Sequence, residues 1–352
     1  MTDDLKFNVS VIIPVYNGGI SFRSCLSSLT QAVTPFTEII VVADGDSDGS
    51  WLVAEEFGAK VVKIPVCGGP GKARNIGARA AKGDILFFVD ADVVICADTI
   101  SKVLKAFENQ RDLTALIGSY DDEPGSSNFL SQYKNLFHHY THQTAKEEAF
   151  TFWGACGAIR REVFLSIGGF DESYRRPSIE DIELGSRLKA AGYKIQLCKD
   201  LQVKHLKHWG VVSLLKAELF YRAIPWTELI WRSRNFSNDL NLDIRSRLST
   251  LFVYILLGAL ITAWWWSGFI VVGLILSLLL LKLNLPVYRF FYEKRGFWFA
   301  LGVIPWHWFY FIYCGFAFVF GTVKYFLHEL FKSKLAIPSI YKHNLQKIST
   351  RL

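Results

Sequence analysis

The chain has 352 residues, is 51% apolar and carries a formal net charge of +7. This length allows two or three domains with a large core. Because the positive charge lies mainly in the second half, beside apolar runs, we expect contact with anionic lipid head groups and no nucleic-acid partner. The six cysteines lie far apart without a C-x-x-C pair, which argues against a disulfide framework and a zinc site.

The first 210 or so residues alternate between predicted strands and helices. Apolar strands are expected at residues 9–16, 38–44, 60–66 and 85–94, and the helical stretches between them include 49–58 and 69–83. The N-terminus has acids where a secretory signal needs a basic flank, so no signal peptide is expected. Near-continuous valine and isoleucine runs separated by helices predict an α/β fold with a parallel sheet buried on both faces. Ligands of such sheets bind at the carboxyl ends of the strands.

The fourth predicted strand ends with Asp90 and Asp92, separated only by Ala91. Side chains at a spacing of two share one face of a strand, so both acids are expected on the same face. Two such acids repel each other unless a positive group lies between them, and a divalent cation is one interpretation. The other is a solvated turn acid followed by a helix cap.

Polar residues also follow the first two predicted strands, which end at Asn17 and at Asp44. Asp48 with Gly49 suits a helix cap. Three strand ends with acidic or polar residues at one sheet edge favour a common ligand site there.

The loop "GGPGKARNIG" is not a phosphate-binding loop of a known pattern. Val66 stands where the first glycine of a P-loop belongs, Ala73 follows the lysine, and Arg74 occupies the last glycine of Gly-x-Gly-x-x-Gly. Lys72 and Arg74 either neutralise a diphosphate with their side chains or are solvated cations at a helix start.

The segment 152–193 is rich in glycine and ends in the amphipathic helix "EDIELGSRLKAAG". Glycines such as Gly154 indicate a backbone that turns tightly or passes close to another group. Glu180 and Asp181 open the helix at its positive end, which is a complete structural explanation for both acids. The functional alternative is that one of them is a catalytic base.

Residues 209–236 mix apolar and aromatic side chains with arginines and a lysine. This pattern suits two helices in the membrane interface with Pro225 as the break between them. The alternative is a pair of ordinary helices covering the sheet.

Long apolar runs dominate the C-terminal third. Residues 251–283 contain one charge, Lys282, and residues 296–320 contain none. We expect three membrane spans, at about 249–266, 268–283 and 297–326, the last tilted or kinked at Pro305, with an exterior C-terminus. The basic tail favours a cytosolic end instead, which a re-entrant third segment would allow.

Five ordered segments, over roughly residues 8–210, resemble glycosyltransferase family 2. They are "IIPVYN", "VVADGDSDGS", "KARNIGARAAKGDILFFVDAD", "WGACGAIRREVFLSIGGFDE" and "EDIELGSRL". The resemblance implies a GT-A fold, a Rossmann-like mostly parallel sheet flanked by helices, followed here by C-terminal transmembrane helices. It also implies an inverting transfer from a nucleotide-diphosphate sugar.

The resemblance assigns the metal and the base. Asp90 and Asp92 become the D-x-D motif, whose second acid holds Mg²⁺ or Mn²⁺ against the diphosphate, and Asp181, beside Glu180, becomes the catalytic base. The expected metal ligands are Asp90, Asp92 and His205, with His208 as the alternative histidine.

The resemblance also places Asp44 against the nucleotide base. Ala43 and Asp46 depart from the family's usual pattern at this strand end, and the Gln-x-x-Arg-Trp motif of processive synthases is absent, which argues against a polymerase. The residues expected to contact the nucleotide sugar are Pro14, Tyr16, Asn17, Asp44, Lys72, Arg74, Asp90 and Gly154.

The expected organisation follows from these assignments. It comprises a cytosolic GT-A domain at 1–208, interface helices at 209–248, a membrane region at 249–328 and a basic tail at 329–352. The expected acceptor is lipid-linked, or a glycolipid, at the inner membrane of the cell. The alternatives are a saccharide or exopolysaccharide acceptor, and a non-catalytic scaffold; the scaffold is disfavoured because the acids are retained. A nucleotidyltransferase would need a glycine-rich loop that the first strand lacks.

Overall fold

The computed structural model describes residues 7–34, 36, 38–234 and 243–335. Its N-terminal part is a mixed sheet with the strand order β3-β2-β1-β4-β7-β6-β8-β5. The strands are β1 (Val9–Val15), β2 (Glu38–Asp44), β3 (Lys60–Ile64), β4 (Ile85–Val89), β5 (Val93–Ile95), β6 (Leu113–Tyr120), β7 (Cys156–Arg160) and β8 (Lys194–His205). The first four run parallel to one another, as their apolar runs predict.

The second half of the sheet is mixed. β7 is antiparallel to both β4 and β6, β6 is parallel to β8, and the short β5 is antiparallel to β8 at the edge. The core lies on both faces of the central strands; Ile12 and Ile13, on opposite faces of β1, are both fully buried. Phe88 of β4 contacts the rings of Phe164 and Phe170 at centroid distances of 5.2 and 5.3 Å.

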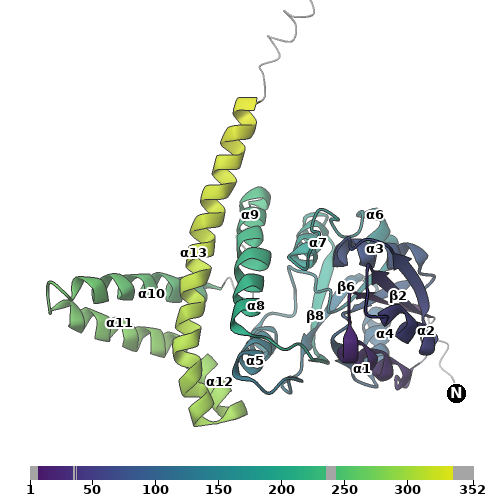
Figure 1. The fold of residues 1–352 in the computed structure, drawn as a ribbon, viewed down its shortest axis with the longest axis horizontal. Coiled ribbons are helices and arrows are strands. Elements are labelled where there is room, and N and C mark those ends of the chain that lie inside the picture. Colours follow the sequence, from purple (N-terminus) through teal and green to yellow (C-terminus); the bar gives the residue numbers. More distant parts are fainter. Residues whose placement is uncertain (1–6, 35, 37, 235–242, 336–352) are drawn as a thin grey trace, which may run out of the picture.

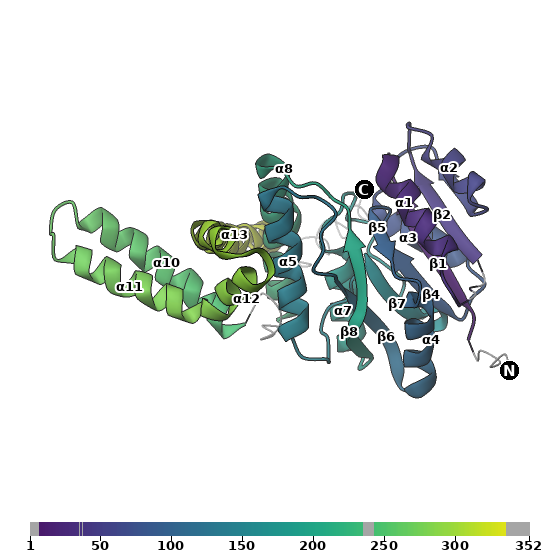
Figure 2. The same cartoon turned by 90° about the horizontal axis from the view of Figure 1, so that it is seen from below.

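Helices cover the sheet and join its strands. They are α1 (Gly19–Thr30), α2 (Ser50–Glu56), α3 (Pro70–Ala80), α4 (Thr99–Asn109), α5 (Phe129–Thr144), α6 (Arg161–Ser166) and α7 (Glu180–Ala190). α5 lies between the sheet and the C-terminal helices α12 and α13 rather than over the centre of the sheet (Figure 2). The predicted helices at 49–58 and 69–83 correspond to α2 and α3.

The strand expected at 85–94 is in fact two strands, which corrects the prediction for its acids. β4 ends at Val89, the backbone N–H of Val93 donates to the carbonyl of Asp90 at 3.1 Å, and β5 then pairs with β8. Asp90 and Asp92 therefore lie in a turn between two strands and not on one strand face. The chain turns here because β4 belongs to the centre of the sheet and β5 to its edge.

The expected break at Pro225 is also absent. α8 (Val211–Lys216), the π-helix η1 (Ala217–Ala223) and α9 (Ile224–Ser233) form one continuous helical run, with Pro225 in the first turn of α9. The missing N–H and the bulky ring of a proline disturb a regular α-helix, and the wider turns of the π-helix just before it accommodate both. This run packs against α7 on one side and α13 on the other.

The C-terminal helices are α10 (Ile244–Thr262), α11 (Phe269–Leu283), α12 (Leu285–Arg295) and α13 (Phe297–Leu335). Among the described residues, α10 and residues 297–331 of α13 are long and apolar enough to cross a membrane, and α11 with α12 could form a third span bent by 61°. α13 continues through Pro305 as one helix. The basic tail from residue 336 onward lies outside the described residues.

Helices α10 and α11 form a hairpin that projects crosswise to α13, away from the sheet (Figures 1 and 2). α8 and α9 run alongside α13 between that helix and the sheet (Figure 1). Of the expected spans at 249–266, 268–283 and 297–326, the first and third correspond to α10 and α13, which are long and apolar enough to cross a membrane, whereas the second, α11, meets this test only together with α12.

Candidate active site

A buried arginine joins the turn after β4 to the start of α7. Arg74, in α3, has a side chain only 5% exposed; its Nη2 donates to Asp90 Oδ1 at 2.6 Å and its Nη1 to Glu180 Oε1 at 3.0 Å. The other oxygen of Glu180 accepts from the backbone N–H of Ser178 at 2.9 Å. The structure thus pairs Arg74 with two carboxylates of the protein itself, so its charge is already neutralised by these side chains.

Gly154 is explained by its distance to Arg74. A Cβ at this position would lie 2.7 Å from Cζ of the guanidinium, which is closer than van der Waals contact permits. The expectation of a close backbone approach is therefore confirmed. The backbone N–H of Gly154 also donates to Asp181 Oδ2 at 3.3 Å. This bond fixes the carboxylate of Asp181 next to the arginine cluster, by which we mean Arg74 with Asp90 and Glu180.

The pKa of Asp181 is raised to about 6. Burial is the main cause and the adjacent Glu180 adds to it, while Arg74, Arg222 and the hydrogen bond from Gly154 oppose the shift. A carboxylate with this pKa is mostly ionised at neutral pH and still basic enough to accept a proton from a reacting hydroxyl.

Asp181 faces a cavity of about 50 Å³ between α5, the segment before β7, α7 and the helical run 211–233. Arg222 and Trp226, one helical turn apart, line it together with Lys134 and Trp153. Lys134 Nζ also pairs with the buried Glu218 at 2.7 Å. The sequence analysis did not assign these four residues to the site; the spacing of Arg222 and Trp226 on one helix face is the signal that could have indicated them.

Asp92 faces a histidine on β8. Its Oδ2 lies 3.5 Å from Nε2 of His205, whose Nδ1 lies 2.7 Å from Oδ1 of Asn135. An amide oxygen can only accept, so Nδ1 of His205 donates to Asn135, and Nε2 is the ring nitrogen that faces Asp92. Burial raises the pKa of Asp92, but the hydrogen bond and charge of His205, with Lys207, outweigh it and bring the pKa to about 2.

These two side chains fit a divalent cation. A carboxylate oxygen and an imidazole nitrogen are both ligands of Mn²⁺ and related metals, and a ligating histidine typically donates its second N–H to an oxygen, as His205 does to Asn135. Within the described ranges no cluster of three or more metal-binding side chains exists, so the protein offers a pair. Asp90 is paired with Arg74 instead, and Nδ1 of His208 contacts Ser126 Oγ at 2.9 Å, away from Asp92.

The residues expected around the nucleotide surround the ends of β1 and β2. Both oxygens of the buried Asp44 accept backbone N–H groups, from Gly68 at 2.7 Å and from Gly69 at 2.8 Å, so Asp44 fixes the loop before α3. Asn17 Oδ1 accepts from the backbone N–H of Ser47 at 2.8 Å. These bonds hold together three loops at the edge where a nucleotide is expected.

The remaining expected contacts lie nearby. Pro14 is near the end of β1, and Tyr16, just beyond it, is 58% exposed. The side chain of Lys72 lies against Gly68, and no ion pair of Lys72 occurs within the described part of the chain. Asp48 accepts from the backbone N–H of Ser50 at 3.0 Å at the start of α2, which confirms its predicted capping role.

The chain matches known glycosyltransferase sequences. Residues 10–168 match the family described as glycosyl transferase family 2, and residues 134–209 match the N-terminal domain of galactosyltransferase. An uncharacterized glycosyltransferase of Bacillus subtilis, YfnE, is 26% identical over 56% of this chain and 64% of its own length. An uncharacterized glycosyltransferase of Haemophilus influenzae is 28% identical over 50% of this chain and 60% of its own length. The chain therefore spans less than two thirds of either relative.

Solved structures share the fold. The mannosyltransferase PcManGT from Pyrobaculum calidifontis, in complex with GDP-Man and Mn²⁺, has a TM-score of 0.53 at 15% identity, over 91% of this chain and 87% of that one. S. aureus TarS 1–349 in complex with UDP-GlcNAc has a TM-score of 0.50 at 22% identity, over 64% and 66%. These likenesses confirm the predicted fold class, a GT-A type sheet flanked by helices.

The first prediction concerns the arginine cluster. Arg74→Gln removes the cation shared by Asp90 and Glu180 and leaves uncompensated buried charge, which typically costs about 3–5 kcal/mol. We expect a clearly lower thermal unfolding midpoint for the purified protein in detergent. The double variant Arg74→Gln/Glu180→Gln should recover part of the loss, because the remaining buried charge is smaller.

The matched control is Arg23→Gln. Arg23 pairs with Glu56 at 2.8 Å, but both side chains are more than half exposed, so the pair stabilises little. Equal midpoints for Arg74→Gln and Arg23→Gln would show that the buried cluster does not hold the site together.

Proposed function

We propose that the protein is a glycosyltransferase of family 2, whose model matches residues 10–168. It transfers a sugar with inversion from a nucleotide-diphosphate sugar to a lipid-linked or other membrane-proximal acceptor. One observation carries the proposal. Arg74 hydrogen-bonds both Asp90, in the turn that also holds Asp92, and Glu180, the neighbour of Asp181. Arg74 thereby holds the turn with the candidate metal ligand Asp92 on one side and the helix with the candidate base Asp181 on the other.

Asp181 is the proposed base. The acceptor hydroxyl attacks the anomeric carbon as the bond from that carbon to the diphosphate oxygen breaks, and Asp181 takes the hydroxyl proton. Gly154 holds the carboxylate in place through its backbone N–H. Trp153, Arg222 and Trp226, which line the cavity at Asp181, limit the room for water beside the reacting hydroxyl.

Asp92 and His205 are the proposed ligands of Mg²⁺ or Mn²⁺. A bound cation supplies charge neutralisation for the departing nucleoside diphosphate. The Mn²⁺ named with PcManGT, a protein of the same fold, is consistent with this assignment. The donor contacts proposed are Pro14, Tyr16, Asn17, Asp44, Lys72 and Gly154, with Asp90 and Arg74 acting as positioning residues.

The membrane part of the proposal rests on where charges lie along α9 and α13. Glu228 of α9 and Lys324 of α13 form a partly exposed ion pair at 2.7 Å, and such charges are costly in the hydrocarbon core. The hairpin of α10 and α11, by contrast, exposes apolar side chains such as Leu260 and Ile261 and carries Trp264 at its exposed tip. α13 also exposes apolar side chains, such as Phe316 and Val319. We propose that the hairpin is embedded in the membrane and that α9 and α13 lie along its surface, with the apolar side chains of α13 towards the lipid.

The proposed membrane arrangement implies a location for the catalytic domain and the acceptor. In this proposal the catalytic domain lies on the cytosolic side of the inner membrane, opposite the hairpin. The helical run 211–233 contacts α7, which carries Asp181, as well as α13, so the cavity at Asp181 opens at the level of the lipid head groups. A lipid-borne acceptor is favoured over a soluble saccharide for this reason.

The activity and its base are tested together. The purified chain is screened with UDP- and GDP-sugars, with total membrane lipid as acceptor. With the donor that is used, Asp181→Asn should lower turnover roughly 10²- to 10⁴-fold, because the amide cannot accept a proton, while donor binding is retained. The exposed Asp112→Asn is the control. Near-normal turnover of Asp181→Asn would remove Asp181 as the base.

The pH profile gives an independent measurement. The raised pKa of Asp181 means that the group is protonated, and inactive as a base, below about pH 6. We therefore expect kcat/KM to rise with pH up to about 6 and then level off. Asp181→Asn should lose this rise; if the rise persists in the variant, another group is responsible.

A further prediction concerns the cation. Asp92→Ala should abolish Mn²⁺-dependent binding of nucleoside diphosphate in calorimetry, because it removes one of the two proposed protein ligands. Binding measured in EDTA should be the same in the variant and the wild type, which separates loss of the cation from loss of the fold. Unchanged affinity in Mn²⁺ would contradict the metal role.

The topology is tested with reporters. An embedded hairpin returns the chain to the cytosol, so a reporter fused after Leu352 should be active only in the cytosol, and one inserted at Ser267 in the hairpin tip only outside. This places the basic tail where the positive-inside tendency favours it. Activity outside the cell from the fusion after Leu352 would instead support three spans.

A further inference from the structure

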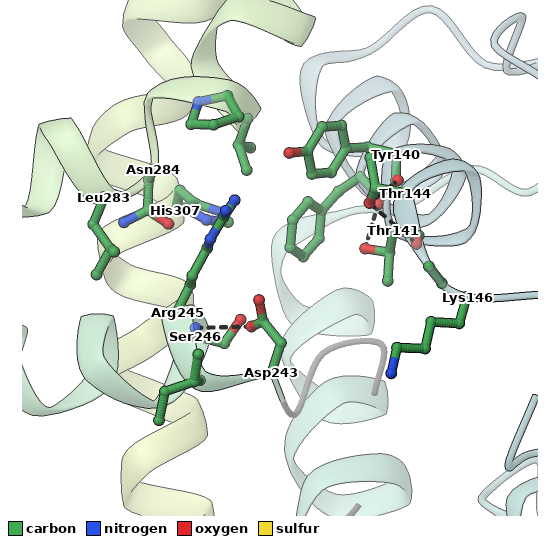
Figure 3. Close-up of a pocket in the computed structure, with 15 residues that line it drawn as sticks. Tyr140, Thr141, Thr144, Lys146, Asp243, Arg245, Ser246, Leu283, Asn284 and His307 are labelled. Carbon is green, nitrogen blue, oxygen red and sulfur yellow. Dashed lines mark hydrogen bonds between the residues drawn. The ribbon is translucent and has the colours of Figure 1, made fainter. Parts of the chain in front are cut away.

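A second and larger cavity lies between the catalytic domain and the membrane hairpin. Its volume is about 420 Å³, and its lining includes Tyr140 of α5 and Lys146 just beyond that helix, Asp243 and Arg245 at the start of α10, and Asn284 between α11 and α12. Figure 3 shows the labelled side chains from α5 on one side and those from the hairpin on the other. A cavity of this size accommodates a small ligand or the head group of a larger one.

The charges of this cavity favour an anion. Lys146 and Arg245 both line it, and within the described residues neither has a hydrogen-bond or ion-pair partner. The one acid of the lining, Asp243, is occupied as the N-cap of α10, where its Oδ1 accepts from the backbone N–H of Ser246 at 2.9 Å. Lys146 lines the cavity on the α5 side and Arg245 on the hairpin side (Figure 3), and a phosphate in the cavity can accept charge-assisted hydrogen bonds from such cations.

The cavity adjoins the smaller one at the proposed base. Phe137 and Thr141, one turn apart on α5, line both this cavity and the smaller one that Asp181 faces. A ligand that passes these two side chains would lie along this face of α5, with one end at Asp181 and the other in the larger cavity. At the same end, Ile244 and Leu283 line the cavity where the hairpin begins, so a hydrocarbon chain can leave along apolar helices.

We propose that this cavity binds the phosphate of the acceptor, and that the acceptor is a phosphate-linked glycolipid whose sugar hydroxyl reaches Asp181. The inference rests on the proposed function. A hydroxyl nucleophile needs a base, whereas a phosphate nucleophile is already ionised, so a site that combines a base with a separate cation pair fits a lipid carrying both groups. Lys146 and Arg245 are positioning residues, since they hold the phosphate and touch no reacting atom.

The experiment uses the full chain in phosphatidylcholine nanodiscs with EDTA present, so that the proposed cation site does not contribute. Farnesyl phosphate, farnesol and inorganic phosphate are titrated separately. We expect farnesyl phosphate to bind the wild type more tightly than the other two, and Lys146→Gln/Arg245→Gln to weaken its binding by about tenfold or more, because two charge-assisted contacts are lost. The matched control is Lys105→Gln/Arg111→Gln, which removes the same charges from α4 and the loop after it.

Each outcome is decisive. Unchanged farnesyl phosphate binding in Lys146→Gln/Arg245→Gln would overturn the inference, as would an equal loss in the control variant. Inorganic phosphate binding as tightly as farnesyl phosphate would identify a free-phosphate site and overturn the lipid assignment. Hydrolysis of the sugar donor by water reports the proposed function separately and should be unchanged in this variant. If the wild type turns over no donor, the proposed function is contradicted. The titration with farnesyl phosphate then still decides by itself whether the cavity binds a lipid phosphate.

Discussion

The guanidinium of Arg74 is the interaction on which the proposed active site depends. It lies between two carboxylates from distant parts of the chain, Asp90 in the turn after β4 and Glu180 at the start of α7. Removing three charged groups from water is costly, and hydrogen bonds at 2.6 and 3.0 Å are needed to offset that cost. Once they form, the turn and the helix are fixed relative to each other.

Two further features follow from this contact. Position 154 must be glycine, because its backbone passes next to the guanidinium. Asp181 is left beside Glu180 in a poorly solvated place, which raises its pKa, while the neighbouring Arg74 limits the rise. A side chain that contacts no substrate in this scheme therefore sets both the position of the base and its charge at neutral pH.

A second set of buried charges joins α5 to the helical run 211–233. Glu218, in the π-helix, pairs with Lys134 of α5 at 2.7 Å and lies 3.7 Å from Arg222. Trp231 and Thr322, hydrogen-bonded at 2.8 Å, join α9 to α13. The helical run 211–233 is thus attached to α5 on one side and to α13 on the other, and it also lines the cavity at Asp181.

The sequence predicted the features that depend on neighbouring residues. The strands at 9–16 and 38–44 follow from their apolar runs, and the capping role of Asp48 from its position before a helix. The prediction that Asp90 and Asp92 share a face was wrong because a turn, which depends on where β5 pairs, intervenes. Arg74 is visible in the sequence as a charge, but its partner Glu180 is 106 residues away. Lys134 and Arg222 were missed for the same reason.

The charges around Asp181 also restrict the acceptor. Asp181 and Glu180 are adjacent carboxylates, and Arg74 is already shared between Glu180 and Asp90. Lys134 is likewise paired with Glu218. Arg222 is then the main cation left to face a ligand in the small cavity, and it lies near Glu218 as well. A doubly charged phosphate would be repelled there by the ionised base, whereas a neutral sugar hydroxyl would not. Lys146, just beyond α5, and Arg245, at the start of α10, have no partner among the described residues, and the proposed phosphate site there lies apart from the proposed site of the nucleophile.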